Sequence, residues 1–303
     1  MNIQKQISLG AFLTLKTATK ARYFTEADSL PALQEAIAWA RYHHLPYCLI
    51  GGGSNLVFRT DEYPGLIIKN SLKDVKVIKE DERSVTVLVG GGCPLALLIN
   101  RALAQGWSGL EYHRGLPGTV GGALAMNSKW TKPLAFVSDN LIKATLLNRD
   151  GNRVRSVKRP YFRFAYDFST VQTTGEIIVD GSFHFPKAEP ALLRKRAEAA
   201  LAYRKETQPV GAATCGCFFQ NISAADQRRL RLPTASAGYL IDRCGLKGVS
   251  VGGFSVSAVH ANFIVNLHPG ESCLGDLFNL TNLIKTQIEE KYQIKLKEEV
   301  VMI

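Results

Sequence analysis

Three clusters of glycine are the segments of this 303-residue chain best suited to bind a ligand. They are Gly51–Gly53, Gly90–Gly92 and the run R-G-L-P-G-T-V-G-G from Arg114 to Gly122. Glycine has no Cβ, so backbone N–H groups can approach a phosphate closely there. Taken alone, the first cluster could be a tight turn. It is neither a Rossmann fingerprint nor a P-loop, because no G-x-G-x-x-G opens a helix and no G-K-[ST] follows. Three such loops at strand ends predict one extended ligand whose pyrophosphate is held by backbone amides.

Cysteine is the second residue type that could act chemically. The spacing of Cys215 and Cys217, C-G-C, is not a usual zinc pattern, and no paired C-x-x-C occurs. We therefore expect no metal site. Free thiols are favoured over disulfides, because the chain is large and shows no export signal.

The formal net charge of +11 favours anionic partners. Lys and Arg are scattered, and no RNA- or DNA-binding signature accompanies them, so nucleic acid is a weak alternative. A nucleotide diphosphate would explain part of the charge equally well, and so would solubility alone. No apolar run reaches the ~18–20 residues of a membrane span, and the N-terminus lacks a signal-peptide core. We expect a cytoplasmic monomer with no nucleic-acid or membrane partner.

The elements that must position the loops begin with a helix over residues 29–44, whose apolar side chains recur at helical spacing. Strands over residues 47–50 and 65–69 complete a compact βαβ unit. Alternating valines predict two strands within residues 74–89, around a polar turn at 80–83. A helix over 94–105 ends at Gly106.

Short strands and longer helices fill the rest of the chain. The expected strands cover residues 141–148, 153–157, 176–185, 216–221, 254–256, 263–265, 294–296 and 300–303, and the expected helices cover 188–206, 237–244 and 274–292. The fold class is α+β. We divide the chain into a first cofactor lobe (1–72, joined by a C-terminal strand over about 293–303), a second cofactor lobe (73–206) and a substrate domain (207–292).

Nine ordered segments resemble the UDP-N-acetylenolpyruvoylglucosamine reductase family, in its shorter subclass. They are I-G-G-G-S-N-L-V (50–57), G-L-P-G-T-V-G-G-A (115–123), F-A-Y-D-F-S (164–169), Y-R-x-x-x-Q-P (203–209), C-G-C-F-F-Q-N (215–221), A-G-Y-L-I-D (237–242), G-L-K-G (245–248), H-A-N-F-I-V-N (260–266) and L-K-E-E-V (296–300). The resemblance implies a two-lobed FAD-binding domain of the vanillyl-alcohol-oxidase type with a small α+β substrate domain. It also implies that NADPH reduces FAD, and that hydride then reaches C3 of UDP-N-acetylglucosamine-enolpyruvate to give UDP-N-acetylmuramate.

The resemblance also implies where the ligands bind. It places FAD at residues of the first and third glycine loops and two positions beyond them: Gly51, Gly52, Gly53, Ser54, Asn55, Gly115, Pro117, Gly118, Thr119, Gly121, Gly122, Asn127 and Tyr166. It places the substrate at Tyr203, Arg204, Gln208 and Asn221, where an arginine suits a diphosphate because its planar fork can pair with phosphate oxygens.

Two catalytic residues follow from the same resemblance. Cys217 occupies the position of a proton donor that is commonly serine, and a thiol gives up a proton more readily than a hydroxyl. Glu299 occupies the position of a catalytic carboxylate, with Glu298 as the neighbouring alternative. The alternative is that both residues are non-catalytic: Cys217 a small buried residue of a strand, and Glu299 an exposed charge near the chain end. Cys215 is expected to be structural.

One departure concerns charge. The family pattern F-x-Y-R-x-S carries a catalytic arginine where this chain has Asp167. Arg163 or another arginine could replace that charge, the reaction could run slowly, or catalysis could be lost. The leading interpretation is a working reductase. The alternatives are a catalytically impaired relative that still binds FAD and UDP-sugar, and another flavin oxidoreductase on the same fold, such as an oxidase.

Overall fold

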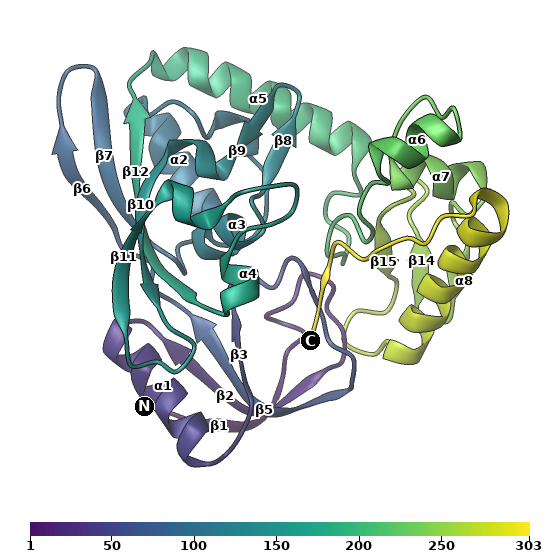
Figure 1. Ribbon diagram of the computed structural model, residues 1–303, viewed down its shortest axis with the longest axis horizontal. Helices are drawn as coiled ribbons and strands as arrows, with labels where there is room; N and C mark the ends of the chain where they lie inside the picture. The colour runs from purple at the N-terminus through teal and green to yellow at the C-terminus, as the bar shows by residue number, and fades with distance from the viewer. The chain divides into compact units, whose positions relative to one another are not determined.

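The computed structural model describes all 303 residues, which form two compact units (Figure 1). Unit 1 comprises Met1–Lys5, Tyr23–Gly52 and Pro64–Arg204. Unit 2 comprises Gln6–Arg22, Gly53–Tyr63 and Lys205–Ile303. Both contain helices and sheets, which confirms the α+β class. The division into two cofactor lobes and a substrate domain stays a prediction.

Unit 1 is built around two sheets. The first has the strand order β1-β2-β5-β3, with β1 Gln4–Ser8, β2 Lys20–Ala27, β5 Glu62–Asn70 and β3 Tyr47–Ile50. The second has the order β11-β10-β12-β7-β6, with β11 Val154–Lys158, β10 Leu141–Leu147, β12 Ile177–Pro186, β7 Ser84–Gly90 and β6 Val75–Glu80. β3 and β5 run parallel, whereas the pairs of the second sheet are antiparallel.

The helices of unit 1 are mostly those that the sequence predicts. They are α1 Leu30–Tyr42, α2 Leu95–Gln105, α3 Val120–Ala125, α4 Val171–Thr174 and α5 Pro190–Thr207, with short 3₁₀ turns at Glu111–His113, Val137–Asn140 and Arg159–Phe162 and a hairpin of β8 Lys129–Thr131 and β9 Leu134–Phe136. Gly106 ends α2 in the left-handed conformation, at φ 72°. α3 packs on β12 and β7 (Figure 1), so its glycine-rich start lies beside the end of β7.

Unit 2 holds a small sheet of β13 Ser250–Val251, β14 Phe254–Val256 and β15 Ile264–Asn266. Its helices are α6 Ala224–Arg229, α7 Ala237–Arg243 and α8 Leu274–Tyr292. The last strand, β16 Val301–Met302, pairs in parallel with β4 Leu56–Val57. A core cluster of this unit joins Phe218, Phe219, Leu240 and Ile284.

Two predicted strands of unit 2 are wrong. Residues 216–221 make only isolated bridges, Cys217 with Phe263 and Phe219 with Glu298. The alternation breaks because Gly216 lies at φ 88° and the adjacent Phe218 and Phe219 are both buried. Residues 294–296 form no strand, and regular pairing of the C-terminal segment is limited to β16.

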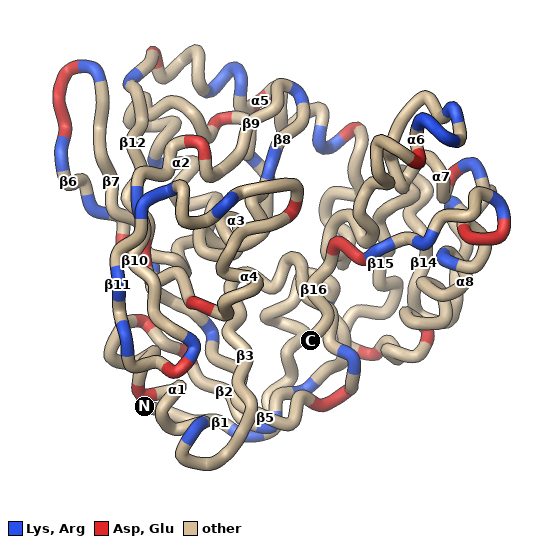
Figure 2. The backbone as a smooth tube through the Cα atoms, in the orientation of Figure 1, with Lys and Arg blue, Asp and Glu red and all other residues tan.

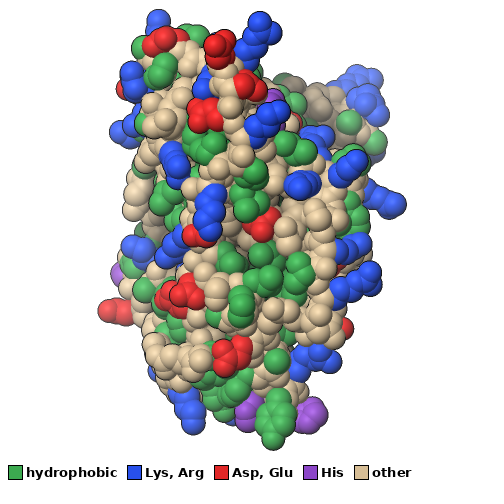
Figure 3. Space-filling model, turned by 90° about the vertical axis from the view of Figure 1, so that its left-hand side faces the viewer, with side chains coloured by type: hydrophobic (Ala, Val, Ile, Leu, Met, Phe, Trp, Pro, Cys, Tyr) green, Lys and Arg blue, Asp and Glu red, His purple; other side chains and the backbone are tan.

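Charged residues are spread along the backbone of both units (Figure 2). On the face of unit 1 that carries β6, β7 and β11, basic side chains alternate with acidic and apolar ones (Figure 3). The basic residues that give the chain its net charge of +11 therefore form no continuous patch on that face. No helix combines the length and the apolar character needed to cross a membrane.

A buried histidine in unit 1 predicts a loss of stability in acid. His113 has no exposed surface, and neither ring nitrogen has a hydrogen-bond partner. Burial, with a smaller contribution from the Arg204 charge, lowers the pKa of His113 from 6.5 to about 4. In the unfolded chain His113 takes up a proton near pH 6.5, whereas in the folded chain it does so only near pH 4. The contribution of the neutral His113 to the free energy of unfolding is therefore complete above pH 6.5 and is lost as the pH falls toward 4. We expect a cost on the order of 2–3 kcal/mol over that range.

Urea unfolding at a series of pH values from neutral to acid, on the parent and on His113→Leu, measures this dependence. The variant should show a free energy of unfolding that falls less steeply between pH 6.5 and 4. His184→Leu, which removes an exposed histidine of β12, is the matched control and should keep the parent's slope. Identical slopes for the parent and His113→Leu would contradict the argument.

Candidate functional site

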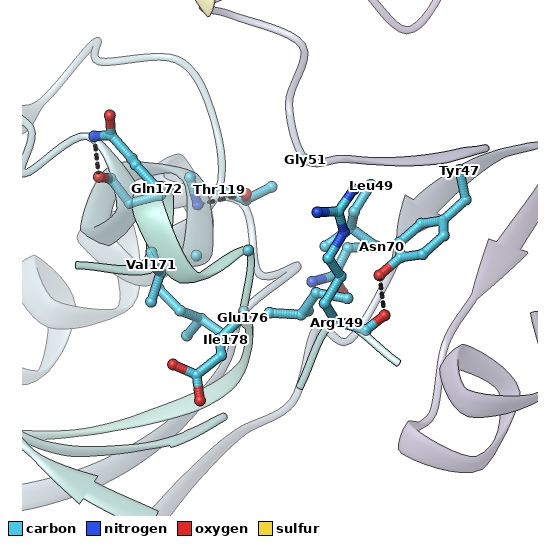
Figure 4. Close-up of a pocket in the computed structure, with 16 residues that line it drawn as sticks. Tyr47, Leu49, Gly51, Asn70, Thr119, Arg149, Val171, Gln172, Glu176 and Ile178 are labelled. Carbon is cyan, nitrogen blue, oxygen red and sulfur yellow. Dashed lines mark hydrogen bonds between the residues drawn. The ribbon is translucent and has the colours of Figure 1, made fainter. Parts of the chain in front are cut away.

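A cavity of about 320 Å³ lies within unit 1 (Figure 4). The end of β3, the end of β7, the start of α3 and the start of β12 contribute its walls. Among the residues that line it are Tyr47, Gly51, Asn70, Gly91, Thr119, Gly121, Gly122, Ala125, Arg149, Val171, Gln172 and Glu176. Each of the three glycine-rich loops predicted to bind one ligand therefore contributes to a single cavity.

The loops meet backbone to backbone. A Cβ on Gly52 would lie 2.5 Å from the Cα of Gly118, and a Cβ on Gly121 would lie 2.8 Å from the carbonyl oxygen of Gly91. The Gly121 N–H donates to that same oxygen at 2.7 Å. Side chains at these positions would push the loops apart, so glycine is required there by the fold itself.

Gly122 differs from its neighbours. A Cβ at this exposed position would meet only the Thr119 hydroxyl, at an ordinary 3.5 Å. The amides of Val120, Gly121 and Gly122 already donate within the protein, to Cys93 O, Gly91 O and the Thr119 side chain. The absence of a side chain at Gly122 thus leaves open space toward the cavity, which the protein does not fill.

Two cations of unit 1 belong to the site although the sequence did not single them out. Arg149 follows β10, and its side chain lies among the cavity-lining residues Tyr47, Leu49 and Asn70 (Figure 4). Lys69 on β5 donates to the carbonyl of Gly51, and burial lowers the pKa of its ammonium. Neither residue lies in a glycine-rich segment, so no local motif signals it.

The one carboxylate that lines the cavity is neutralised by its neighbours. Arg155 holds Glu176 through Nε at 2.8 Å and through a second nitrogen at 2.7 Å. Burial raises the pKa of Glu176, but hydrogen bonds from Tyr161, Arg155 and Thr174 outweigh it and the pKa is lowered. An anionic ligand in the cavity therefore meets little opposing charge from this group.

Other predicted cofactor residues hold the cavity's surroundings together. Asn127 uses both ends of its buried amide within the protein, accepting from Ser138 at 2.7 Å and donating to Ala165 O at 2.9 Å. Gly115, at φ 85°, faces α5, where its Cβ would come within 2.9 Å of Leu201. Tyr166 is 44% exposed, and the Lys129 ammonium lies 3.8 Å from its ring centroid.

The predicted diphosphate-binding pair sits at the end of α5. Tyr203 is hydrogen-bonded by Lys132 at 2.9 Å, and the buried Arg204 stacks over the Trp130 ring at 4.9 Å. Tyr203, Lys132 and Trp130 line a second cavity of about 230 Å³. The pair is thus held in an aromatic and cationic environment.

In unit 2 the structure brings the two predicted catalytic residues onto adjacent backbone segments. The Glu299 N–H donates to the carbonyl of Phe218, the residue after Cys217, at 2.8 Å. Asn55 donates from its side chain to Glu299 O at 3.3 Å and accepts from Val301 N at 2.9 Å. A predicted cofactor residue therefore anchors the segment that carries Glu299.

The neighbours of these residues have other roles. Cys215 is buried, and desolvation raises the pKa of its thiol to about 12, with a minor contribution from the Glu299 charge. Cys217 is half-buried. The carboxylate of Glu298 forms an ion pair with Lys285 of α8.

The remaining predicted substrate residues also lie in unit 2. Asn221 accepts from the N–H of Ala237, the first residue of α7, at 3.2 Å. Gln208 lies just after α5 and is half-buried. This contact gives Asn221 a structural role and fixes its side-chain amide at one end.

Two family models match the chain. One is described as an FAD binding domain and covers residues 21–156. The other is described as the C-terminal domain of UDP-N-acetylenolpyruvoylglucosamine reductase and covers residues 208–303.

Known proteins match over nearly the full length. The UDP-N-acetylenolpyruvoylglucosamine reductase of Chlamydia trachomatis serovar L2 is 34% identical over 299 residues, which is 99% of this chain and 95% of that protein. The protein of the same name from Acaryochloris marina is 34% identical over 99% of this chain and 92% of its own. The crystal structure of the Thermus caldophilus reductase superposes with a TM-score of 0.80 at 26% identity, covering 100% of this chain and 99% of that one. These matches confirm the predicted fold.

Proposed function

Because the chain belongs to the UDP-N-acetylenolpyruvoylglucosamine reductase family, we propose that it reduces UDP-N-acetylglucosamine-enolpyruvate to UDP-N-acetylmuramate with FAD and NADPH. This reaction supplies a peptidoglycan precursor, and we place it in the cytoplasm, with the protein acting as a monomer. The observation that carries the proposal is the cavity of unit 1, where three glycine loops meet in a chain matched from end to end to reductases.

The residues of this cavity fit FAD. Gly122 leaves space that no protein atom fills, Arg149 offers a positive charge, and the carboxylate of Glu176 is already paired. Backbone amides of the 51–55 loop would hold the diphosphate, as glycine-rich loops do elsewhere. When bound, FAD would accept hydride from NADPH and supply hydride to C3 of the enolpyruvyl group.

The chain's own side chains would manage charge and proton at the substrate. Hydride addition at C3 leaves negative charge at C2, delocalised into the adjacent carboxylate. Cys217 would donate the proton to C2 from Sγ, and Glu299 would orient or stabilise the enolic species. Glu299 is favoured over Glu298, because it occupies the position of the family's catalytic carboxylate in L-K-E-E-V. Tyr203, Arg204, Gln208 and Asn221 would bind the uridine diphosphate moiety.

The test is to purify the protein, record its flavin spectrum and follow NADPH consumption with and without the enolpyruvyl substrate. We expect a yellow protein whose NADPH oxidation depends on the substrate and yields UDP-N-acetylmuramate. A yellow protein that binds the UDP-sugar without turnover would instead establish the catalytically impaired relative, to which Asp167 draws attention. Consumption of NADPH with oxygen alone would favour an oxidase.

Arg149 gives a more specific prediction for the cofactor. We expect Arg149→Met to weaken FAD binding by about fivefold to tenfold, because an exposed cation contributes roughly 1 kcal/mol to an anionic ligand. FAD titration of the apoprotein, followed by flavin fluorescence at low and high salt, measures the effect. The difference between parent and variant should shrink at high salt.

Arg153→Met is the matched control, since Arg153 is exposed in the same turn but does not line the cavity. It should bind FAD as the parent does. Equal losses in both variants would show that only the general positive charge of this surface matters.

A further inference from the structure

A buried ion pair in unit 1 supplies a cation at the position where the family pattern has an arginine. Lys129 opens β8, and its ammonium lies 2.7 Å from Oδ1 of Asp167. The side chains are only 20% and 7% exposed. Arg163, the predicted substitute, is exposed and ends a 3₁₀ turn at φ 44°.

This pair is costly for the fold. Oδ2 of Asp167 is buried and has no hydrogen-bond partner, which leaves half of the carboxylate unsatisfied. A buried ion pair seldom repays the desolvation of its two charges. Asp167 also adopts a left-handed backbone conformation, at φ 50°, that a non-glycine residue rarely takes. Strain and unmet polar groups of this kind concentrate at functional sites.

The pair is fixed to the wall of the cofactor cavity. Gln172, which lines the cavity, donates to Asp167 O at 2.9 Å. Ser169 donates to the carbonyl of Ala125, another lining residue, at 2.7 Å. Asn127, just after α3, donates to Ala165 O. The loop that carries Asp167 is therefore held at several points beside the site where the cofactor would lie.

Lys129 keeps capacity for a further anion. An ammonium has three N–H donors. One is directed to Asp167, and the cation also lies 3.8 Å from the Tyr166 ring centroid, which stabilises its charge. The carboxylate thus orients the ammonium without exhausting its donors.

We propose that Lys129 is a catalytic cation of this protein, which pairs with the carboxylate of the enolpyruvyl group, and that Asp167 is the residue that positions it. This proposal rests on the proposed function. As C3 gains hydride, the electron pair of the C2–C3 double bond moves toward the substrate carboxylate, and Lys129 stabilises that charge until C2 is protonated. In this chain a lysine, Lys129, oriented by the carboxylate of Asp167 then takes the role that the family pattern gives to an arginine at position 167.

The decisive measurement is ligand binding to the oxidised holoenzyme, read from the flavin spectrum. UDP-N-acetylmuramate carries the carboxylate, and UDP-N-acetylglucosamine lacks it. Lys129→Met should weaken binding of the first about tenfold or more and leave binding of the second unchanged, because a charged hydrogen bond contributes roughly 1.5–3 kcal/mol. A variant that merely disturbs the loop would weaken both ligands or lose FAD.

Kinetics of four variants complete the test. Lys129→Met should lower kcat by ~10²–10³-fold while reduction of the flavin by NADPH stays at the parent rate. Lys129→Arg should recover most of the activity, and Asp167→Asn should lower kcat less than Lys129→Met does. Lys143→Met, which removes an exposed lysine of β10, should behave as the parent.

The failures are distinguishable. A parent protein that binds neither UDP-sugar sinks the proposed function itself. A parent with full turnover whose Lys129→Met variant binds UDP-N-acetylmuramate and turns over normally overturns the role of Lys129 alone. If Arg163→Met loses carboxylate-dependent binding instead, the replacement cation is Arg163.

Discussion

Cys217→Ala is expected to lower turnover of the enolpyruvyl substrate by about 10²–10⁴-fold, the usual contribution of a positioned general acid. The protein should still bind FAD and accept hydride from NADPH at the parent rate, because Cys217 is not among the residues that line the cavity of unit 1. The loss should therefore appear only in the step that consumes the enolpyruvyl group. Stopped-flow measurement of flavin reduction and of its reoxidation by substrate separates the two.

The surroundings of Cys217 explain why a thiol can serve there. Cys217 is half-buried, whereas the thiol of Cys215 is buried and has a pKa raised to about 12. Hydrogen bonds from Phe218 N to Asn262 O and from Glu299 N to Phe218 O fix the backbone just after Cys217. A donor whose adjoining backbone is fixed in this way needs little reorganisation in the transition state.

Two variants make the result interpretable. Cys217→Ser should retain substantial turnover, since a hydroxyl of similar size can occupy the same position. Cys215→Ala is the matched control, with the same chemical change two residues away, and should keep most of the parent's activity. Parent-like turnover in Cys217→Ala would show that another group protonates C2, and Glu299 would be the first to examine.

The sequence predicts well those features that depend on local patterns. The helix over 274–292 matches α8 at both ends, because apolar residues at helical spacing bury one face of it. The three glycine loops lie at strand ends and line one cavity. By contrast β2 was not predicted, since its charged ends obscure the alternation of Ala21, Tyr23 and Thr25.

Features that depend on distant contacts could not be predicted. Lys129 and Asp167 are 38 residues apart, and nothing near either one signals a partner. Arg149 enters the cavity only because β10 brings its turn beside β3 of another sheet, where Tyr47 donates to Arg149 O. The roles of Cys217, Glu299 and the FAD-binding residues remain predictions, and the Cys217 variants described above test the first of them.

Gly122→Ala is the second change for which we expect a large effect, a loss of FAD affinity of ~10–100-fold. The protein itself has room for the methyl group, because the nearest atom to a Cβ is Thr119 Oγ1 at an ordinary contact distance of 3.5 Å. Alanine also favours helix over glycine by roughly 1 kcal/mol, so α3 should be no less stable. The methyl would stand in the cavity, where an overpacked contact costs ~1–3 kcal/mol or more.

The comparison between glycines is what makes this variant informative. Gly52→Ala would also lose FAD, but its Cβ would lie 2.5 Å from the Gly118 Cα and would displace the loops, so the loss could reflect misfolding. Gly275→Ala, in the first turn of α8, meets only ordinary contacts and should change neither FAD content nor stability appreciably. FAD titration and urea unfolding of the apoproteins measure both quantities. If Gly122→Ala folds like the parent and also binds FAD like the parent, the cofactor does not pass over this turn of α3. Gly122 is then not part of the FAD-binding site.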